Sequence, residues 1–264
     1  MLFDFHIHVF PEKVAAKAIP RLAGICGQTP LTDGTLPDTL RLMERDGVDA
    51  GAFLNIATKP SQQRTINEAC LSMRSARVIP FGSVHPEADD AVEELFWIHS
   101  HGIPGVKLHP DYQGFFVDDK RLWPIYETCR ELGLILVFHA GWDPLSPDLI
   151  HCLPEACARV LEAFPGLTLV LAHLGGMNLW DDVERFLVGK NVYFDTACLE
   201  GKISPERLKH IIRSHGADKI LFASDCPWGS PAGLRELISS LGLTPEEESL
   251  IFWENACRLL KLPR

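Results

Sequence analysis

The apolar and polar positions of this chain alternate in a long-range pattern. Short apolar segments rich in Val, Ile, Leu and Phe are separated by longer segments with helical spacing. Nearly continuous apolar runs are typical of strands covered on both faces, as in parallel sheets. The predicted strands lie at residues 2–9, 50–57, 78–84, 105–109, 134–139, 168–173, 192–196 and 220–225.

Pro, Asp and Gly mark the ends of the predicted helices. Several helices begin with Pro or Asp, which helix N-termini favour. Gly47, Gly102, Gly133 and Gly166 each precede a predicted strand, as expected for a left-handed residue that ends a helix. The predicted helices include residues 38–46, 61–77, 88–101, 119–132, 154–164, 205–215 and 231–241. A helical appendage at residues 244–262 is predicted to cover the outside of the fold.

Eight strands that alternate with helices predict parallel pairing and an α/β fold. We expect a closed (β/α)₈ TIM barrel that forms a single domain over residues 1–264. The alternative is an open, doubly wound sheet. That fold typically carries a G-x-G-x-x-G turn after its first strand for a nucleotide phosphate, and this chain lacks the motif there.

The first predicted strand carries Asp4, His6 and His8 between apolar residues. Strict alternation places these three side chains on one face of the strand. Two neutral imidazoles on one face are good ligands for zinc, iron or manganese. The pair alone is a weak signal, because two histidines in a strand are more often ordinary surface or core residues.

Composition limits the classes of partner and the cell compartment that we expect for the protein. With 264 residues, 46% of them hydrophobic, the chain can bury a full core. A net charge of -10 with dispersed Lys and Arg argues against nucleic acid as a partner. The apolar runs are too short to cross a membrane, and no cationic leader opens the sequence, so we expect a cytoplasmic protein. The eight cysteines form no C-x-x-C pair and are expected to be reduced and mostly buried.

Ionisable residues recur at the carboxyl ends of the predicted strands. In a barrel these ends form the rim where active sites are built. A single histidine or aspartate there is as often structural, but buried charges and imidazoles in such number are costly unless a metal ion is coordinated. The residues in question are His6, His8, Lys107, His109, His139, His173 and Asp225.

The same residues resemble a known metal centre. The H-x-H of strand one, with Lys107, His139, His173 and Asp225, is similar to the centre of the amidohydrolase superfamily of metal-dependent hydrolases. The segments at residues 171–176, 222–228 and 254–260 resemble in particular the branch that contains aminocarboxymuconate-semialdehyde decarboxylase. The resemblance spans essentially the whole predicted barrel.

The resemblance implies roles for these side chains. His6, His8, His139 and Asp225 would hold a divalent ion, and His173 would bind the ion or polarise a substrate carbonyl. Asp225 would also accept a proton from an activated water and pass it to the leaving group. Apart from the resemblance, the strand face that Asp4 shares with His6 and His8 predicts that it orients the two histidines or forms a buried salt bridge with a lysine or arginine of the barrel.

Lys107 decides the number of ions. A protonated lysine is repelled by a nearby dication, so Lys107 in the site must be neutral, displaced or chemically altered. In binuclear members of the superfamily a carboxylated lysine on strand four bridges two metals, whereas the decarboxylase branch works with one. We expect one divalent ion, zinc by preference with manganese or iron as alternatives, and a second ion only if Lys107 is modified.

The predicted rim loops combine aromatic and polar groups. His109, Tyr112, Trp142 and Trp228 follow strands four, five and eight and are candidates for contact with a small planar or carbonyl substrate. The tryptophans are equally consistent with simple packing of the loops. The sequence is compatible with a homo-oligomer.

Three functions compete at this stage. The preferred one is a metal-dependent hydrolase of a small ester, lactone or amide, which uses a metal-activated water. The alternative is a metal-dependent, non-oxidative decarboxylase of an aromatic or unsaturated acid, which needs the same ion. The third is a non-catalytic barrel that keeps zinc or another ligand without turnover.

Overall fold

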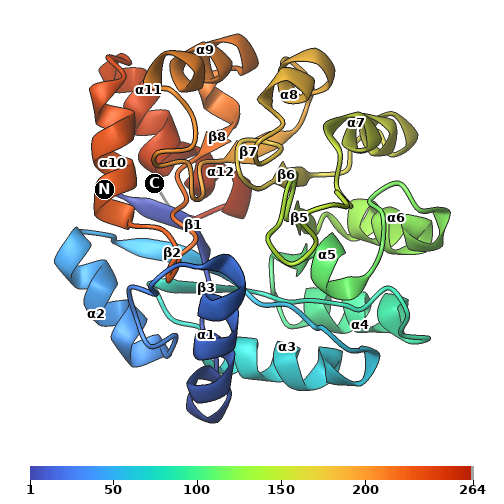
Figure 1. The fold of residues 1–264 in the computed structure, drawn as a ribbon. Helices are drawn as coiled ribbons and strands as arrows, with labels where there is room; N and C mark the ends of the chain where they lie inside the picture. Colours follow the sequence, from blue (N-terminus) through green and yellow to red (C-terminus); the bar gives the residue numbers. More distant parts are fainter. Residues whose placement is uncertain (263–264) are drawn as a thin grey trace.

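Parallel strands form the centre of the computed structural model, which describes residues 1–262 (Figure 1). Within this part of the chain there are eight strands, one at each predicted position. The strands are β1 (Phe3–Ile7), β2 (Ala50–Leu54), β3 (Val78–Phe81), β4 (Gly105–Leu108), β5 (Ile135–Phe138), β6 (Leu169–Leu171), β7 (Tyr193–Asp195) and β8 (Ile220–Leu221).

The strands close into a barrel. They form two parallel ladders, one of β1 to β3 and one of β4 to β8. Parallel bridges between Gly82 and Val106 and between Ile7 and Cys226 join the ladders on both sides. The predicted (β/α)₈ TIM barrel is therefore confirmed.

Helices surround the barrel in Figure 1. The helices that were predicted are α2 (Leu36–Asp46), α3 (Gln63–Ser72), α4 (Ala91–Ser100), α6 (Trp123–Leu132), α7 (Pro154–Ala163), α9 (Pro205–His215) and α10 (Pro231–Ser240). Those not predicted are α1 (Glu12–Cys26), α5 (Pro110–Gln113) and α8 (Trp180–Phe186), while η1 (Pro60–Gln62), η2 (Lys120–Leu122) and η3 (Ala217–Lys219) are single 3₁₀ turns. Gly47, Gly102, Gly133 and Gly166 all have positive φ, as predicted for residues that end a helix before a strand.

Alternate side chains of a strand point to opposite faces and belong to two different apolar layers. Ile135 and Val137 of β5 lie in a cluster inside the barrel, whereas Leu136 and Phe138 lie in the larger cluster between strands and helices. The inner cluster is filled from the amino-terminal end by Phe3 and its neighbours. The carboxyl end of the barrel is therefore the part left to polar side chains.

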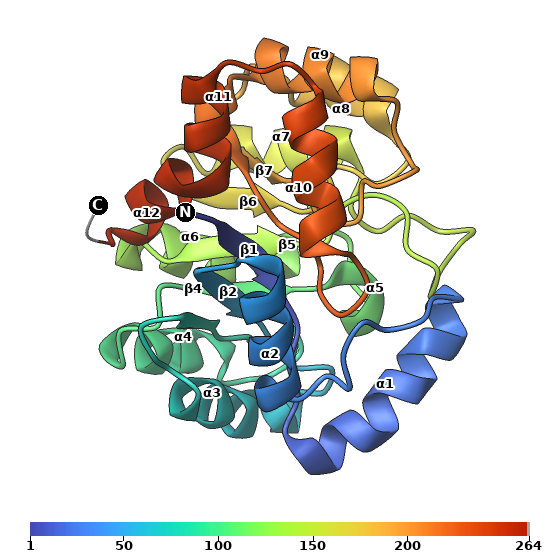
Figure 2. The ribbon, with the colours of Figure 1, turned by 90° about the vertical axis from the view of Figure 1, so that its left-hand side faces the viewer.

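The C-terminal segment does not lie where it was predicted. It comprises α11 (Pro245–Ser249), the π-helical turn η4 (Leu250–Glu254) and α12 (Asn255–Leu260). Ile251 joins the outer layer, but Trp253, Ala256 and Leu259 pack with the inner cluster. The segment thus seals the amino-terminal opening, and Figure 2 shows α12 beside the start of β1. The expectation that it covers the outside was wrong because the inner layer leaves apolar rings at that opening; Phe3 lies 6.1 Å from Trp253 between ring centroids.

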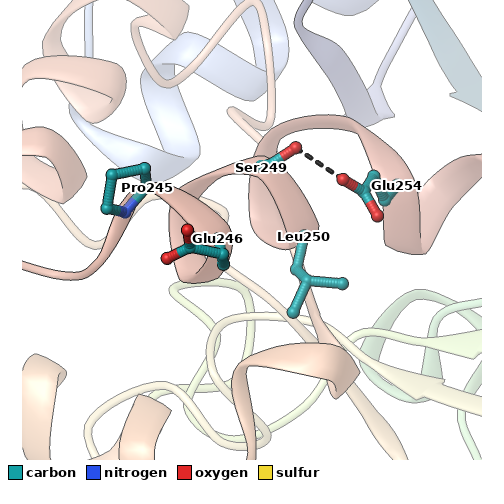
Figure 3. A pocket seen from close by; sticks show the side chains of 5 residues that line it. All are labelled: Pro245, Glu246, Ser249, Leu250 and Glu254. Carbon is teal, nitrogen blue, oxygen red and sulfur yellow. Dashed lines mark hydrogen bonds between the residues drawn. The ribbon is translucent and has the colours of Figure 1, made fainter.

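A surface hollow of about 380 Å³ lies on the same segment (Figure 3). It is lined by Pro245, Glu246, Ser249, Leu250 and Glu254. The Ser249 hydroxyl donates a hydrogen bond of 2.6 Å to Glu254 across it. The hollow contains none of the predicted site residues.

In residues 1–262 no helix has both the length and the apolar character needed to cross a membrane.

Several strands end earlier than predicted, at the rim. The sixth and eighth predicted strands run to His173 and Asp225, but β6 ends at Leu171 and β8 at Leu221. His173 and Asp225 have φ of 57° and 68°, which strand pairing cannot accommodate. A left-handed conformation costs a non-glycine residue of order 1 kcal/mol. The backbone is therefore held in a strained form at two residues that were predicted to act in the site.

Candidate metal centre

Three predicted ligands converge at the carboxyl end of β1 and β8. Nε2 of His6 lies 3.1 Å from Nε2 of His8, and the two nitrogens lie 3.4 and 3.1 Å from Oδ1 of Asp225. These three groups form one cluster suited to a metal ion. Backbone hydrogen bonds between the strands fix the arrangement, because the Asp225 N–H donates to the His6 carbonyl and the His8 N–H to that of Cys226.

An irregularity in β1 turns the two histidines inward. Asp4 pairs with Gly51 and Ile7 with Phe53, so three steps along β1 match two along β2. This extra residue is a β-bulge, and it reverses which side of the strand faces the barrel. Phe3 and Phe5 accordingly lie in the inner cluster, and Ile7 in the outer one.

The bulge also turns the Asp4 side chain away from the imidazole rings of His6 and His8. The Asp4 carboxylate accepts hydrogen bonds from the backbone N–H groups of His6 and Ser224 and from the Ser224 hydroxyl. Burial raises its pKa from 3.8 to about 7, although these hydrogen bonds oppose the rise. Neither predicted role of Asp4 holds, because it contacts backbone and Ser224 rather than an imidazole, a lysine or an arginine. Its place is to fix β1 against the segment that follows β8.

The Nδ1 atoms of His6 and His8, which point away from the cluster, both donate hydrogen bonds. Nδ1 of His8 donates to the Leu54 carbonyl at 2.7 Å, and a carbonyl can only accept. Nδ1 of His6 donates to Asp195 at 2.8 Å. In the neutral imidazole the proton is then on Nδ1, so both Nε2 atoms present lone pairs. Two lone pairs and a carboxylate oxygen within 3.4 Å repel one another, and a cation among them removes the conflict.

The electrostatics of the cluster agree with this protonation. Burial lowers the pKa of His6 well below 6.5, and Lys107 lowers it further. Burial opposes ionisation of Asp225, but the imidazoles of His6 and His8 outweigh it and hold its pKa below the ordinary 3.8. Neutral imidazoles and an ionised carboxylate are the forms that bind divalent metals.

Lys107 lies beside the cluster. Its Nζ is 3.5 Å from Nε2 of His6, and the side chain is fully buried. Burial lowers the pKa of Lys107 from 10.5 to about 8, despite the opposing effect of Asp195 and Asp225. The amine is thus more easily neutral than an ordinary lysine, as an amine next to a dication must be.

His139 and His173 are close to each other but lie to one side of the cluster. Nε2 of His173 lies 3.0 Å from Nδ1 of His139, and Nδ1 of His173 donates to the Ala197 carbonyl at 2.9 Å. The ring centroid of His173 lies 5.7 Å from that of His6. Of the four ligands implied by the resemblance, the structure groups His6, His8 and Asp225, whereas His139 groups with His109 and Asp143.

The other predicted contact residues lie on the rim loops. The Tyr112 ring stands edge-on against His109, 4.5 Å away between centroids. Trp142 and Trp228 are half-buried, and their backbone N–H groups donate to the carbonyls of Met177 and Asp225. The loops that carry the two tryptophans are thereby attached to the residues around the centre.

Asp195 and Cys198 were missed in the sequence. Asp195 binds Nδ1 of His6 through one oxygen and accepts the His173 and Ala197 N–H groups through the other. The Cys198 thiol donates to Asp225 at 3.3 Å. A carboxylate behind a ligating histidine fixes its ring orientation and tautomer. The signal for Asp195 was available, since it is an acid at the carboxyl end of a barrel strand, like Asp225 at the rim.

Comparison with known proteins agrees with this architecture. The chain is 25% identical over 219 residues to 2-amino-3-carboxymuconate-6-semialdehyde decarboxylase of Dictyostelium discoideum, which covers 68% of this chain and 60% of that protein. The chain thus spans about 60% of the length of that curated relative. Its fold matches 5-carboxyvanillate decarboxylase LigW from Sphingomonas paucimobilis with a TM-score of 0.76, 17% identity and 99% of both chains covered.

A second structural match contains a metal. Dihydroxybenzoic acid decarboxylase from Polaromonas, solved with bound manganese and the inhibitor 2-nitroresorcinol, has a TM-score of 0.71 and 17% identity, with 100% of this chain and 97% of that chain covered. At such identities these matches establish the shared fold. The amidohydrolase family model, Amidohydro_2, matches residues 3–262. This chain therefore belongs to the amidohydrolase family.

Proposed function

We propose that this protein is a metal-dependent enzyme that removes carbon dioxide non-oxidatively from a small aromatic or unsaturated acid. The sequence alone favoured hydrolysis of an ester, lactone or amide, and the comparisons shift the preference. The named relative and both named structural matches are decarboxylases. The manganese in one of them supports a divalent ion as the partner of the His6, His8 and Asp225 cluster.

One observation carries the proposal. The nitrogens of His6 and His8 that face each other at 3.1 Å cannot share a hydrogen bond, because both rings donate from their opposite nitrogens. A divalent cation satisfies these two nitrogens and Asp225 together. When bound, the ion would supply an electrophile that stabilises negative charge as the carbon–carbon bond breaks.

Replacement of a carboxylate by hydrogen requires one proton at carbon, and His173 is suited to deliver it. The hydrogen bond from Nδ1 to the Ala197 carbonyl leaves Nε2 as the atom that takes up and releases the proton. Burial lowers the pKa of His173, although Asp225 and Asp195 oppose the shift. A lowered pKa makes the protonated ring a stronger acid. Nε2 of His173 lies 3.0 Å from Nδ1 of His139, so the two imidazoles are hydrogen-bonded to each other.

Hydrolysis is the second candidate, and Lys107 is the observation in its favour. Its amine is buried, its pKa is lowered to about 8, and it lies 3.5 Å from a nitrogen of the cluster. These are the properties expected of a lysine that becomes carboxylated and bridges two ions. The two functions differ in product rather than in fold.

A substrate panel separates the candidates. Purified protein loaded with manganese or zinc is incubated with carboxyl-labelled hydroxybenzoates and unsaturated acids, and in parallel with lactones and esters. We expect release of labelled carbon dioxide from at least one acid and none with Asp225→Asn. Release of acid from a lactone, with no carbon dioxide from any carboxylate, would restore hydrolysis as the preferred function.

A further inference from the structure

Asp195 ends strand β7 and is completely buried. It belongs neither to the metal cluster nor to the proposed proton transfer. Its two carboxylate oxygens nevertheless contact residues that carry these two functions. Oδ2 lies 2.8 Å from Nδ1 of His6, and Oδ1 accepts the N–H groups of His173 at 2.8 Å and of Ala197 at 3.0 Å. One buried side chain thus connects a candidate metal ligand to the proposed proton donor.

The contact with His6 fixes the proton of that imidazole. An ionised carboxylate only accepts hydrogen bonds, so Nδ1 of His6 is the donor. In the neutral ring the proton is then absent from Nε2, the atom that lies 3.1 Å from His8 and 3.4 Å from Asp225. A lone pair on this nitrogen is what a divalent ion requires from an imidazole. Asp195 therefore keeps His6 in the tautomer that can bind metal.

The other oxygen of Asp195 holds an unusual turn of the backbone. His173, Leu174 and Gly175 have φ of 57°, 57° and 82°, which makes three left-handed residues in succession. Residues other than glycine adopt this region singly and at a cost, so the surroundings must hold such a turn in place. The Asp195 carboxylate accepts the His173 N–H, and its backbone carbonyl accepts the Leu174 N–H at 2.7 Å. Asp195 thus binds both non-glycine residues of the turn that sets the direction of the His173 ring.

Asp4 is a second completely buried acid with similar backbone contacts. Its Oδ1 accepts the N–H groups of His6 and Ser224, and its Oδ2 accepts the Ser224 hydroxyl. In residues 1–262 its carboxylate forms no hydrogen bond or ion pair with an imidazole. Asparagine can keep all three contacts here, because the hydroxyl can accept from the amide instead of donating. Asp4 is therefore a matched reference for Asp195.

We propose that Asp195 is a positioning residue that sets both the metal-binding tautomer of His6 and the direction of the His173 ring. The part that concerns His6 is independent of the reaction. The part that concerns His173 rests on the proposed decarboxylation, in which His173 delivers the proton to carbon. An amide cannot replace this carboxylate, because its oxygen accepts on one side while its NH₂ group donates on the other.

Asparagine at position 195 has two orientations, and each fails at a different place. With the amide oxygen toward His173 and Ala197, the NH₂ group donates to Nδ1 of His6 and moves the ring proton to Nε2, where it blocks the metal. With the oxygen toward His6, the NH₂ group faces two N–H groups and the left-handed turn loses its acceptor. The first orientation keeps more hydrogen bonds, so we expect metal binding to be affected most.

The tautomer of His6 is tested first, and in the wild type it needs no substitution of Asp195. In metal-free protein with isotope-labelled histidine, long-range proton–nitrogen NMR distinguishes a ring protonated at Nδ1 from one protonated at Nε2. The signals of His6 are identified by their absence in His6→Gln. We expect protonation at Nδ1 in the wild type and in Asp4→Asn, and at Nε2 in Asp195→Asn. A wild-type ring protonated at Nε2 would overturn the proposal even if no variant of Asp195 folds.

Metal affinity is measured next and requires no turnover. Metal-free wild type, Asp195→Asn and Asp4→Asn are titrated with manganese alone, and far-UV circular dichroism checks that each is folded. We expect the dissociation constant to rise about 10–100-fold in Asp195→Asn and to stay close to the wild-type value in Asp4→Asn. An unchanged constant in Asp195→Asn would overturn the proposal. An equal rise in both variants would also overturn it, because loss of a buried carboxylate would then explain the effect without the tautomer.

Turnover at saturating manganese tests the part that concerns His173. With the acid that releases most carbon dioxide in the substrate panel, we expect kcat of Asp195→Asn to stay at least about tenfold below the wild-type value, with KM little changed. A misdirected His173 slows proton delivery rather than binding of the acid. Recovery of the wild-type kcat would remove this part of the proposal. If the wild type releases no carbon dioxide from any acid, the proposed function fails and the His173 part fails with it, whereas the NMR and metal measurements still decide the His6 part.

Discussion

The two ends of the barrel are built from opposite kinds of residues. At the amino-terminal end, Phe3 and Phe5 fill the interior and the C-terminal segment seals the opening through Trp253. At the carboxyl end, the same interior is occupied by buried imidazoles, carboxylates and Lys107. One barrel thus contains an apolar layer that stabilises the fold and a polar layer that carries the chemistry.

The apolar end stabilises the fold, whereas the polar end destabilises it. Burial of large aromatic rings contributes several kcal/mol each, on the order of 25 cal/mol per Å² of apolar surface. The polar layer has costs instead: facing lone pairs, unpartnered nitrogens, and left-handed backbone at His173 and Asp225. A cation held by His6, His8 and Asp225 would offset the first of these costs. The apolar end must therefore support a polar end that is incomplete without its ligands.

The largest expected effect comes from the polar end. The double variant His6→Ala with His8→Ala removes two of the three ligands of the first cluster. We expect one zinc equivalent to be lost and turnover to fall by about a thousandfold or more, which corresponds to ~4 kcal/mol. The fold should persist, because the inner apolar layer is unchanged. Full activity in this variant would contradict the assignment of the metal centre.

The next effect comes from the apolar end. Phe3→Ala empties a fully buried position whose ring lies 6.1 Å from both Phe5 and Trp253. We expect the free energy of unfolding in urea to fall by about 3–5 kcal/mol. Metal content of the folded protein should stay as in the wild type.

A matched control uses a phenylalanine on a helix. Phe96 of α4 is 52% exposed, and its change to alanine should cost under ~0.5 kcal/mol. If Phe3→Ala lowered metal content while Phe96→Ala did not, the two ends of the barrel would be coupled rather than separate.

The barrel could be predicted from the sequence because strand and helix patterns are local. Eight apolar runs, with glycines that end the preceding helices, were enough to place every strand. The apolar rings that the barrel leaves at its amino-terminal opening depend on packing between distant segments, so the position of residues 244–262 could not be predicted. The helix at Glu12–Cys26 contains Pro20, which weakens the sequence signal for a helix.

The sequence pointed to three residues that the structure groups in one cluster, but it did not point to Asp195 or Cys198 and did not predict how the remaining residues are grouped. His6, His8 and Asp225 lie at strand ends, where the rim rule applies. Strict alternation placed Asp4 on the same strand face as His6 and His8. The bulge in β1 changes the face to which the later side chains point, so His6 and His8 turn into the barrel and Asp4 does not. The orientation of His139 toward Asp143 depends on a loop after β5, and loop conformation is not encoded in strand periodicity.

The smallest expected effect concerns a histidine at the apolar end. His215 closes α9 with both nitrogens paired, because Nε2 donates to the Val192 carbonyl at 2.9 Å and Nδ1 accepts the Gly189 N–H at 3.2 Å. Burial lowers its pKa from 6.5 to about 4, so the unfolded chain takes up a proton below about pH 6.5 while the folded protein does not. The contribution of His215 to the free energy of unfolding is therefore fully present above this pH and is lost as the pH falls toward 4. We measure the free energy of unfolding in urea at about pH 7 and at about pH 5. Between these two pH values, the wild type should lose about 2 kcal/mol more than His215→Gln. Because both nitrogens are paired, zinc should leave this difference unchanged; a zinc-dependent difference would mean that metal binding extends to the apolar end.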